Sequence, residues 1–94
     1  MLAFVDAHLD GELTLTKLAD IAAMSPFHFL RSFRLATGAT PGRFVRTRRL
    51  ERARSLLGSG GDVRPIARRF GFNRLGRFLA AYRRQFGPLA PGRP

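Results

Sequence analysis

The side chains best suited to chemistry in this sequence are its arginines. The chain holds sixteen Arg and one Lys against six acidic residues, which gives a formal net charge of +11 over 94 residues. A guanidinium group is planar and carries its donors in a fixed fork, so it fits phosphate oxygens and the O6 and N7 atoms of guanine. An acidic macromolecule is therefore the expected partner, and nucleic acid, an anionic membrane and an acidic protein are the candidates.

Residues that enzymes and metal sites require are scarce. The chain has no Cys, which excludes disulfides, thiolate metal sites and Cys nucleophiles. Its two histidines, His8 and His28, have no carboxylate cluster beside them, so they do not predict a metal site. The glycine-rich segment 58–61 lacks the Lys-Ser/Thr pair of a phosphate-binding loop and is interpreted as a linker. We expect no catalytic residue, no metal and no cofactor.

The charge is unevenly distributed along the chain. Residues 1–24 hold one base against four acids, a net charge of −3, whereas residues 25–94 hold sixteen Arg against two acids, a net charge of +14. The positive potential therefore begins near Ser25.

The sequence has no apolar run of about 18 residues, so no membrane span is expected, and its acidic N-terminus is unlike a signal peptide.

Helices must position these arginines, because apolar residues recur with a helical period and no long stretch alternates in the manner of a strand. We predict an all-α fold of six to seven helices, which include about residues 3–9, 15–22, 26–36, 41–57, 63–70 and 74–86. The expected N-cap residues are Thr14, Ser25, Thr40, Asp62 and Asn73. The expected buried residues include Leu15, Leu18, Ala19, Phe29, Phe33, Phe44, Leu50, Ala53, Leu57, Ile66, Ala67, Phe70, Phe78, Tyr82 and Phe86.

The sequence contains an internal repeat with an offset of 48, which becomes 49 after one added residue. The aligned pairs include Leu18 with Ile66, Ala19 with Ala67, Ala23 with Gly71, Phe29 with Phe78 and Phe33 with Tyr82. Each copy reads as a short helix, a small residue at a tight turn, a capping residue and a second helix with two aromatic residues one turn apart. This pattern is typical of a helix-turn-helix, in which a small residue lets the two helices approach closely.

These residues resemble the DNA-binding domain of AraC/XylS-type bacterial transcription regulators over about residues 13–87. The segments that carry the resemblance are MSPFHFLRSFR, TGATPGRF, RRLERARSLL and IARRFGF. The resemblance implies two homeodomain-like helix-turn-helix subdomains, at 1–40 and 58–94, joined by a connecting helix at 41–57. It also implies sequence-specific binding of double-stranded DNA and regulation of transcription in the bacterial cytoplasm, at the nucleoid. Recognition helices at about 26–36 and 74–86 would occupy successive major-groove segments, about 34 Å apart.

Helical geometry and the resemblance together indicate which side chains face DNA. Phe29 and Phe33 define the core side of the third helix, so Arg31 lies roughly opposite and is the strongest candidate for reading guanine. The predicted base-reading residues are Phe27, His28, Leu30, Arg31, Arg74, Leu75 and Arg77. The predicted phosphate contacts are Ser25, Arg34, Arg46, Arg49, Asn73, Arg83 and Arg84. For Phe27, contact with a thymine methyl or a sugar and a plain packing contact stay open, as do a DNA contact and a plain surface position for His28.

The sequence departs from the family pattern at two places. Gly76 and Ala80 stand on the sixth helix where the family usually has a short hydroxyl residue and an Arg. We therefore expect the first unit to supply most of the sequence discrimination and the second to contribute phosphate contacts. At the C-terminus, the segment Gly87-Pro88-Leu89-Ala90-Pro91 carries an extra residue and lacks the usual aromatic residue.

Other interpretations stay open at this point. Gly76 and Ala80 favour a degenerate helix-turn-helix that binds DNA non-specifically or binds an acidic protein partner. A cationic membrane-surface peptide is disfavoured, because the arginines are spread over several helices that each have a buried face. RNA polymerase is a further candidate partner, and we expect a monomer on DNA, since one chain carries two reading helices. At 94 residues the chain has no room for an effector domain, so it is either a stand-alone DNA binder or a fragment of a longer regulator.

Overall fold

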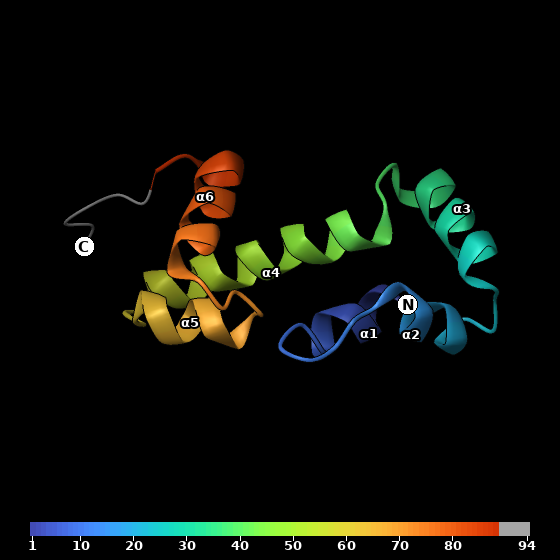
Figure 1. The fold of residues 1–94 in the computed structure, drawn as a ribbon, viewed down its shortest axis with the longest axis horizontal. Helices are drawn as coiled ribbons and strands as arrows, with labels where there is room; N and C mark the ends of the chain where they lie inside the picture. Colours follow the sequence, from blue (N-terminus) through green and yellow to red (C-terminus); the bar gives the residue numbers. More distant parts are fainter. Residues whose placement is uncertain (89–94) are drawn as a thin grey trace. The chain divides into compact units, whose positions relative to one another are not determined.

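A computed structural model of the chain describes residues 1–88, which form helices joined by turns and short loops (Figure 1). The helices are α1 (Leu2–Ala7), α2 (Leu15–Ile21), α3 (Pro26–Thr37), α4 (Pro41–Gly58), α5 (Val63–Arg69) and α6 (Leu75–Phe86). No strand occurs within residues 1–88, so the all-α prediction is confirmed. No helix among these residues is long and apolar enough to cross a bilayer. The departure expected at Leu89-Ala90-Pro91 lies outside the described residues.

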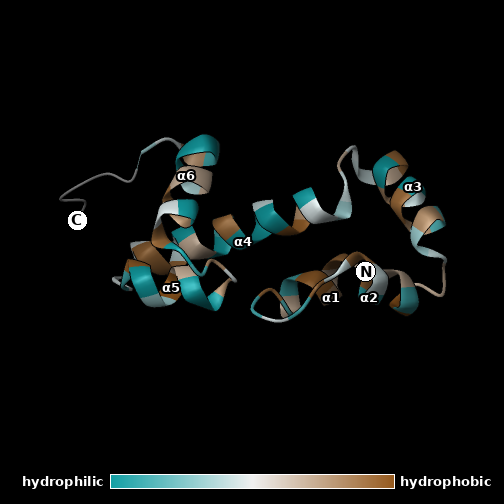
Figure 2. Cartoon of the chain, in the orientation of Figure 1, coloured by the Kyte–Doolittle hydropathy of each residue, from teal (hydrophilic) through white to brown (hydrophobic). Residues whose placement is uncertain are grey.

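The chain divides into two compact units, Met1–Arg48 and a second that begins at Arg49. The core of the first unit includes Val5 and Leu18 together with the rings of Phe29 and Phe33, whose centroids are 5.7 Å apart. In the second unit the ring of Phe78 is fully buried. In Figure 2, α5 shows a hydrophobic and a hydrophilic side, as its sequence period predicts.

Three of the predicted N-caps form as expected. The hydroxyl groups of Thr14, Ser25 and Thr40 each accept a hydrogen bond from the backbone N–H three residues further on, at 3.1, 3.2 and 3.2 Å. Each bond satisfies one of the donors that a helix N-terminus leaves unpaired, a contribution of about 1 kcal/mol. These short polar residues therefore set the starts of α2, α3 and α4.

The second unit differs from the prediction at both of its expected caps. Asp62 occupies the N-cap position of α5, but its side chain makes no capping hydrogen bond. The prediction that Asn73 caps α6 is wrong, because the N-cap is Arg74 and the helix begins at Leu75. The repeat explains the second error: the added residue lies before the cap, so Ser25 corresponds to Arg74 and Asn73 falls outside the helix.

The buried faces also differ from the prediction, since Phe44, Leu57 and Phe86 are half-buried and not fully buried. Leu15 is 37% exposed, because it is the first residue of a short helix and lies at the edge of the face that Leu18 and Ala19 pack. Val45, which the sequence did not single out, is 4% exposed and belongs to the core of the first unit. The prediction assumed one apolar stripe along α4, whereas the residues of α4 buried in the first unit are Pro41 and Val45.

A bidentate ion pair joins α1 to α4 within the first unit. Arg48 Nε donates to Asp6 Oδ1 at 2.8 Å, and Arg48 Nη2 donates to Asp6 Oδ2 at 2.6 Å. Two parallel bonds between a guanidinium and a carboxylate fix both partners more firmly than a single contact does. Because about two fifths of each side chain is exposed, the pair contributes at most about 1 kcal/mol. Asp6 and Arg48 are 42 positions apart, so local spacing in the sequence did not indicate this pair.

The turns between the two helices of each repeat have the same backbone geometry. Ala23 has a left-handed φ of +57°, and Gly71, its counterpart, has a φ of +89°. In both turns this residue and the next donate to carbonyls of the preceding helix, as in a Schellman cap. The bonds are Ala23 N to Asp20 O at 3.0 Å, Met24 N to Ala19 O at 2.9 Å, Gly71 N to Arg68 O at 3.1 Å and Phe72 N to Ala67 O at 2.9 Å. The predicted tight turns and the repeat are thus both present in the backbone.

Exchanging the two turn residues is expected to change stability in opposite directions. Ala23→Gly relieves the left-handed strain of about 1–2 kcal/mol but adds chain entropy to the unfolded state, for a net gain of about 0.5–1 kcal/mol. Gly71→Ala is expected to lower the free energy of unfolding by about 1 kcal/mol or more, because alanine is strained at a φ of +89°. No steric clash adds to this strain, since a Cβ at this residue would meet no neighbour closer than Arg49 Nη1 at 4.0 Å. Urea unfolding of the two variants measures both effects. A loss of stability in Ala23→Gly would contradict the assigned turn geometry.

Candidate nucleic-acid interface

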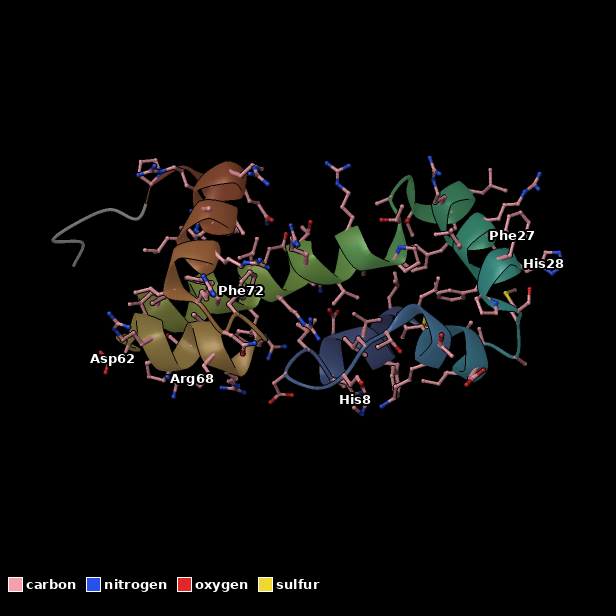
Figure 3. All side chains as sticks on the ribbon, in the orientation of Figure 1. His8, Phe27, His28, Asp62, Arg68 and Phe72 are labelled. Carbon is pink, nitrogen blue, oxygen red and sulfur yellow. The ribbon has the colours of Figure 1, made fainter. Side chains whose placement is uncertain are left out.

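The surface of α3 that faces away from the core carries the first group of predicted base-reading residues. Phe29 and Phe33 turn inward, with 4% and 7% of their surface exposed, whereas Phe27 is 66% exposed. Figure 3 shows Phe27 and His28 projecting outward from the first turn of α3. Their rings are tilted against each other with centroids 6.2 Å apart. Phe27 is therefore a surface residue and not part of the core.

A hollow of about 380 Å³ runs along this side of α3, and Arg31 lies on its wall. The residues that line it are Phe27, Leu30, Arg31, Arg34, Leu35 and Gly38. Their spacing along the chain places them in one stripe of the helix, opposite the buried aromatic pair. We call the five side chains of this stripe, which exclude Gly38, the α3 reading face. Leu35, which is not among the predicted DNA-contacting residues, is 83% exposed on this face.

The centre of the equivalent surface of α6 carries smaller side chains than that of α3. Phe78, Ala81 and Tyr82 are buried, so the opposite side of the helix presents Gly76 and Ala80 to solvent. A Cβ placed on Gly76 would meet no atom within 4 Å, and its backbone is not left-handed, so nothing fills the space over this residue. The arginines Arg77, Arg83 and Arg84 are exposed around this bare centre.

The predicted DNA-contacting residues are mostly accessible. The exposed ones are Ser25, Phe27, His28, Arg31, Arg34, Arg46, Asn73, Arg74, Arg77, Arg83 and Arg84, and the half-buried ones are Leu30, Arg49 and Leu75. In the first unit the structure brings Phe27, Leu30, Arg31 and Arg34 together on one face. The hydroxyl of Ser25 already serves as the cap of α3, accepting from the amide of His28.

Some arginines of α4 make contacts inside their own unit. The Arg54 guanidinium lies 4.7 Å from the centre of the Phe86 ring, a cation–π contact that fastens α4 to α6. Phe86 in turn packs against Tyr82, with ring centroids 4.8 Å apart. Sequence reasoning missed this structural use of Arg54, because it depends on two residues that are far apart in the chain.

Each unit therefore pairs a short helix with a second helix across a tight left-handed turn, and the second helix exposes arginines on the side opposite its core. This arrangement defines a helix-turn-helix protein of the kind that binds nucleic acid. The chain belongs to the AraC family of these proteins. A family model described as a helix-turn-helix domain matches residues 18–91. A probable AraC family transcriptional regulator from Rhodopseudomonas palustris is 30% identical, with a TM-score of 0.80 over 90% of this chain and 82% of that chain.

Two further relatives are similar over most of the chain. The XylDLEGF operon transcriptional activator of Pseudomonas putida is 36% identical over 90 residues, which cover 92% of this chain. The chain spans 28% of the length of that activator. The DNA-binding domain of AdpA, a global transcriptional factor solved in complex with a target DNA, is 34% identical, with a TM-score of 0.84 over 93% of this chain and 79% of that chain.

Proposed function

We propose that this chain binds double-stranded DNA sequence-specifically through the major groove and regulates transcription. The recognition helices are α3 (Pro26–Thr37) and α6 (Leu75–Phe86), and they enter successive major-groove segments. The observation that carries the proposal is the α3 reading face, where Arg31 and exposed apolar side chains share one stripe opposite the core. The similarity to the AdpA domain, which was solved with a target DNA, supports it.

In this proposal the first unit makes more of the base contacts than the second. In the first unit Phe27, His28, Leu30 and Arg31 contact base edges, because side chains on the outer face of a groove-bound helix reach the bases. In the second unit Gly76 and Ala80 leave the centre of the face bare. Arg74, Leu75 and Arg77 then reach base edges only from the start of the helix. The phosphate contacts are Ser25, Arg34, Arg46, Arg49, Asn73, Arg83 and Arg84.

The proposal extends to organisation and partners. Subdomains at 1–40 and 58–94 flank a connecting helix at 41–57, and one chain binds DNA as a monomer. The chain acts in the bacterial cytoplasm at the nucleoid, contacts RNA polymerase when bound near a promoter, and performs no catalysis. We expect no small-molecule sensing by these 94 residues, which span 28% of the length of the P. putida activator.

Selection from a random duplex pool tests the proposal. With duplexes of about 25 bp at about 150 mM salt, we expect enrichment of a motif with one strong block. The affinity for the enriched duplex is expected to fall less steeply with salt than the affinity for unrelated duplexes. Arg83→Ala is expected to weaken binding to all duplexes alike and to lower the salt slope by about one unit. Selection without enrichment, together with the same steep slope on every duplex, would overturn the proposal.

A second candidate function rests on the bare face of α6. A helix-turn-helix whose second unit presents Gly76 and Ala80 is also suited to binding DNA without sequence choice, or to binding an acidic protein surface. Both forms of this alternative predict that selection enriches no motif. A steep salt slope on all duplexes supports non-specific DNA binding, and weak binding to every duplex supports an acidic protein partner.

A further inference from the structure

The α3 reading face is chemically mixed, and its apolar part carries an inference about the DNA it selects. Three of its five side chains, Phe27, Leu30 and Leu35, are apolar, and two of these are among the most exposed hydrophobic residues of the described chain. Large apolar side chains gathered around a surface hollow mark a site that is covered by a partner. The arginines of the same hollow indicate that the partner is an anion.

The major groove presents one bulky apolar group, the C5-methyl of thymine. Every other base edge there offers hydrogen-bond donors or acceptors, and an apolar side chain that covers such a group leaves it unpaired. Apolar residues on a groove-facing helix therefore favour thymine over cytosine by contact and disfavour the other edges by desolvation. The hollow thus has two complementary chemistries, a guanidinium for guanine and apolar walls for methyl groups.

The order of the residues along α3 sets where the methyl groups lie. Phe27 precedes Arg31 by four residues and Leu35 follows it by four, which places each about 6 Å from Arg31 along the axis. Base pairs are about 3.4 Å apart, so each apolar side chain lies within one or two base steps of the guanine that Arg31 contacts. On the basis of the proposed function, we infer that the first unit selects a guanine flanked on both sides by thymines and reads the thymines by their methyl groups.

The second unit offers an internal comparison. By the offset of 49, the positions of Phe27, Arg31 and Leu35 are taken in α6 by Gly76, Ala80 and Arg84. Only Leu79, the counterpart of Leu30, keeps an apolar side chain, and it is 37% exposed. Methyl reading is therefore a property of the first unit, and Leu79 provides a matched control position.

The test replaces thymine by deoxyuridine in the duplex recovered by selection, which removes the methyl group and keeps every hydrogen-bonding atom. Each substitution beside the guanine is expected to weaken binding about three- to fivefold, the effect of one buried methyl group. The same substitution outside the first block is expected to have no effect. Cytosine at a flanking position is expected to bind more weakly than 5-methylcytosine at that position.

Side-chain variants assign each methyl contact. In Phe27→Ala and Leu35→Ala the loss on uracil substitution is expected to disappear at one flank each, as in a double-mutant cycle. Leu79→Ala is expected to keep the full loss at both flanks. Because Phe27 and Leu35 are largely exposed, both variants are expected to keep the wild-type unfolding midpoint, which urea titration checks.

Three results separate the inference from the function on which it rests. Equal binding of uracil and thymine duplexes, with the base preference intact, overturns the inference and leaves sequence-specific binding in place. A uracil effect that survives Phe27→Ala, Leu30→Ala and Leu35→Ala also overturns it, since the methyl groups are then read by other residues. A selection without any enriched motif overturns the proposed function itself.

Discussion

Alanine in place of Arg31 is expected to remove most of the sequence preference of the protein. A bidentate contact between Arg and guanine contributes about 1–3 kcal/mol of discrimination, so affinity for the selected duplex is expected to fall by about 5- to 150-fold. Arg31 is exposed at the middle of the α3 reading face, and no equivalent guanidinium stands at Ala80 in the second unit. Titrations on the selected duplex and on a scrambled one measure the change.

The matched control for this experiment is Arg43→Ala. Arg43 is an exposed arginine of the first unit on α4, so the variant loses the same charge from the same unit. We expect it to weaken the selected and scrambled duplexes by the same small factor. An equal loss on both duplexes in Arg31→Ala would show that Arg31 contacts phosphate, and it would contradict the assignment of base reading to this residue.

Arginine in place of Ala80 is expected to give the protein a second block of sequence preference. Ala80 is exposed and corresponds to Arg31 by the offset of 49, so its side chain starts from the centre of the outer face of α6. Selection with Ala80→Arg is expected to recover a second block about one helical turn from the first. Affinity for this longer site is expected to rise about 5- to 150-fold over the affinity of the wild-type chain.

Gly76→Ala serves as the control for the arginine variant. A Cβ at this residue meets no atom within 4 Å, and alanine in a helix is favoured over glycine by about 1 kcal/mol. The control is expected to raise the stability of the second unit without creating a second block. If Gly76→Ala also produced a second block, a loosely formed α6, and not a missing side chain, would explain the weak reading of the wild-type unit.

Much of the fold could be predicted because its signals are local. Thr14, Ser25 and Thr40 each hydrogen-bond three residues ahead, so the start of a helix can be read from one short segment. The turn at Gly71 could also be predicted, because its left-handed backbone favours glycine and the repeat places it opposite Ala23. The outward side of α3 followed from the spacing of Phe29 and Phe33 alone.

The features that escaped prediction depend on contacts between distant residues or on a one-residue shift. The ion pair of Asp6 with Arg48 spans 42 positions, and sequence spacing favours nearer partners. The start of α6 was placed one residue early, because the expected cap, Asn73, lies one residue before the actual cap, Arg74. The hollow beside Leu35 is also lined by Gly38, which follows the last residue of α3, so side-chain periodicity along the helix does not show it.

The internal contacts of the α4 arginines bear on the counterions that the protein exchanges with DNA. The guanidinium of Arg48 binds the Asp6 carboxylate, and that of Arg54 contacts the Phe86 ring. Each must leave this contact before it can bind a DNA phosphate and release a counterion. These two arginines are therefore expected to add less to the salt dependence of DNA binding than arginines without such internal contacts. Because the logarithm of affinity falls by about 0.9 per unit of log salt for each phosphate neutralised, a salt slope to which Arg48 and Arg54 contribute would mean that their internal contacts open when DNA binds.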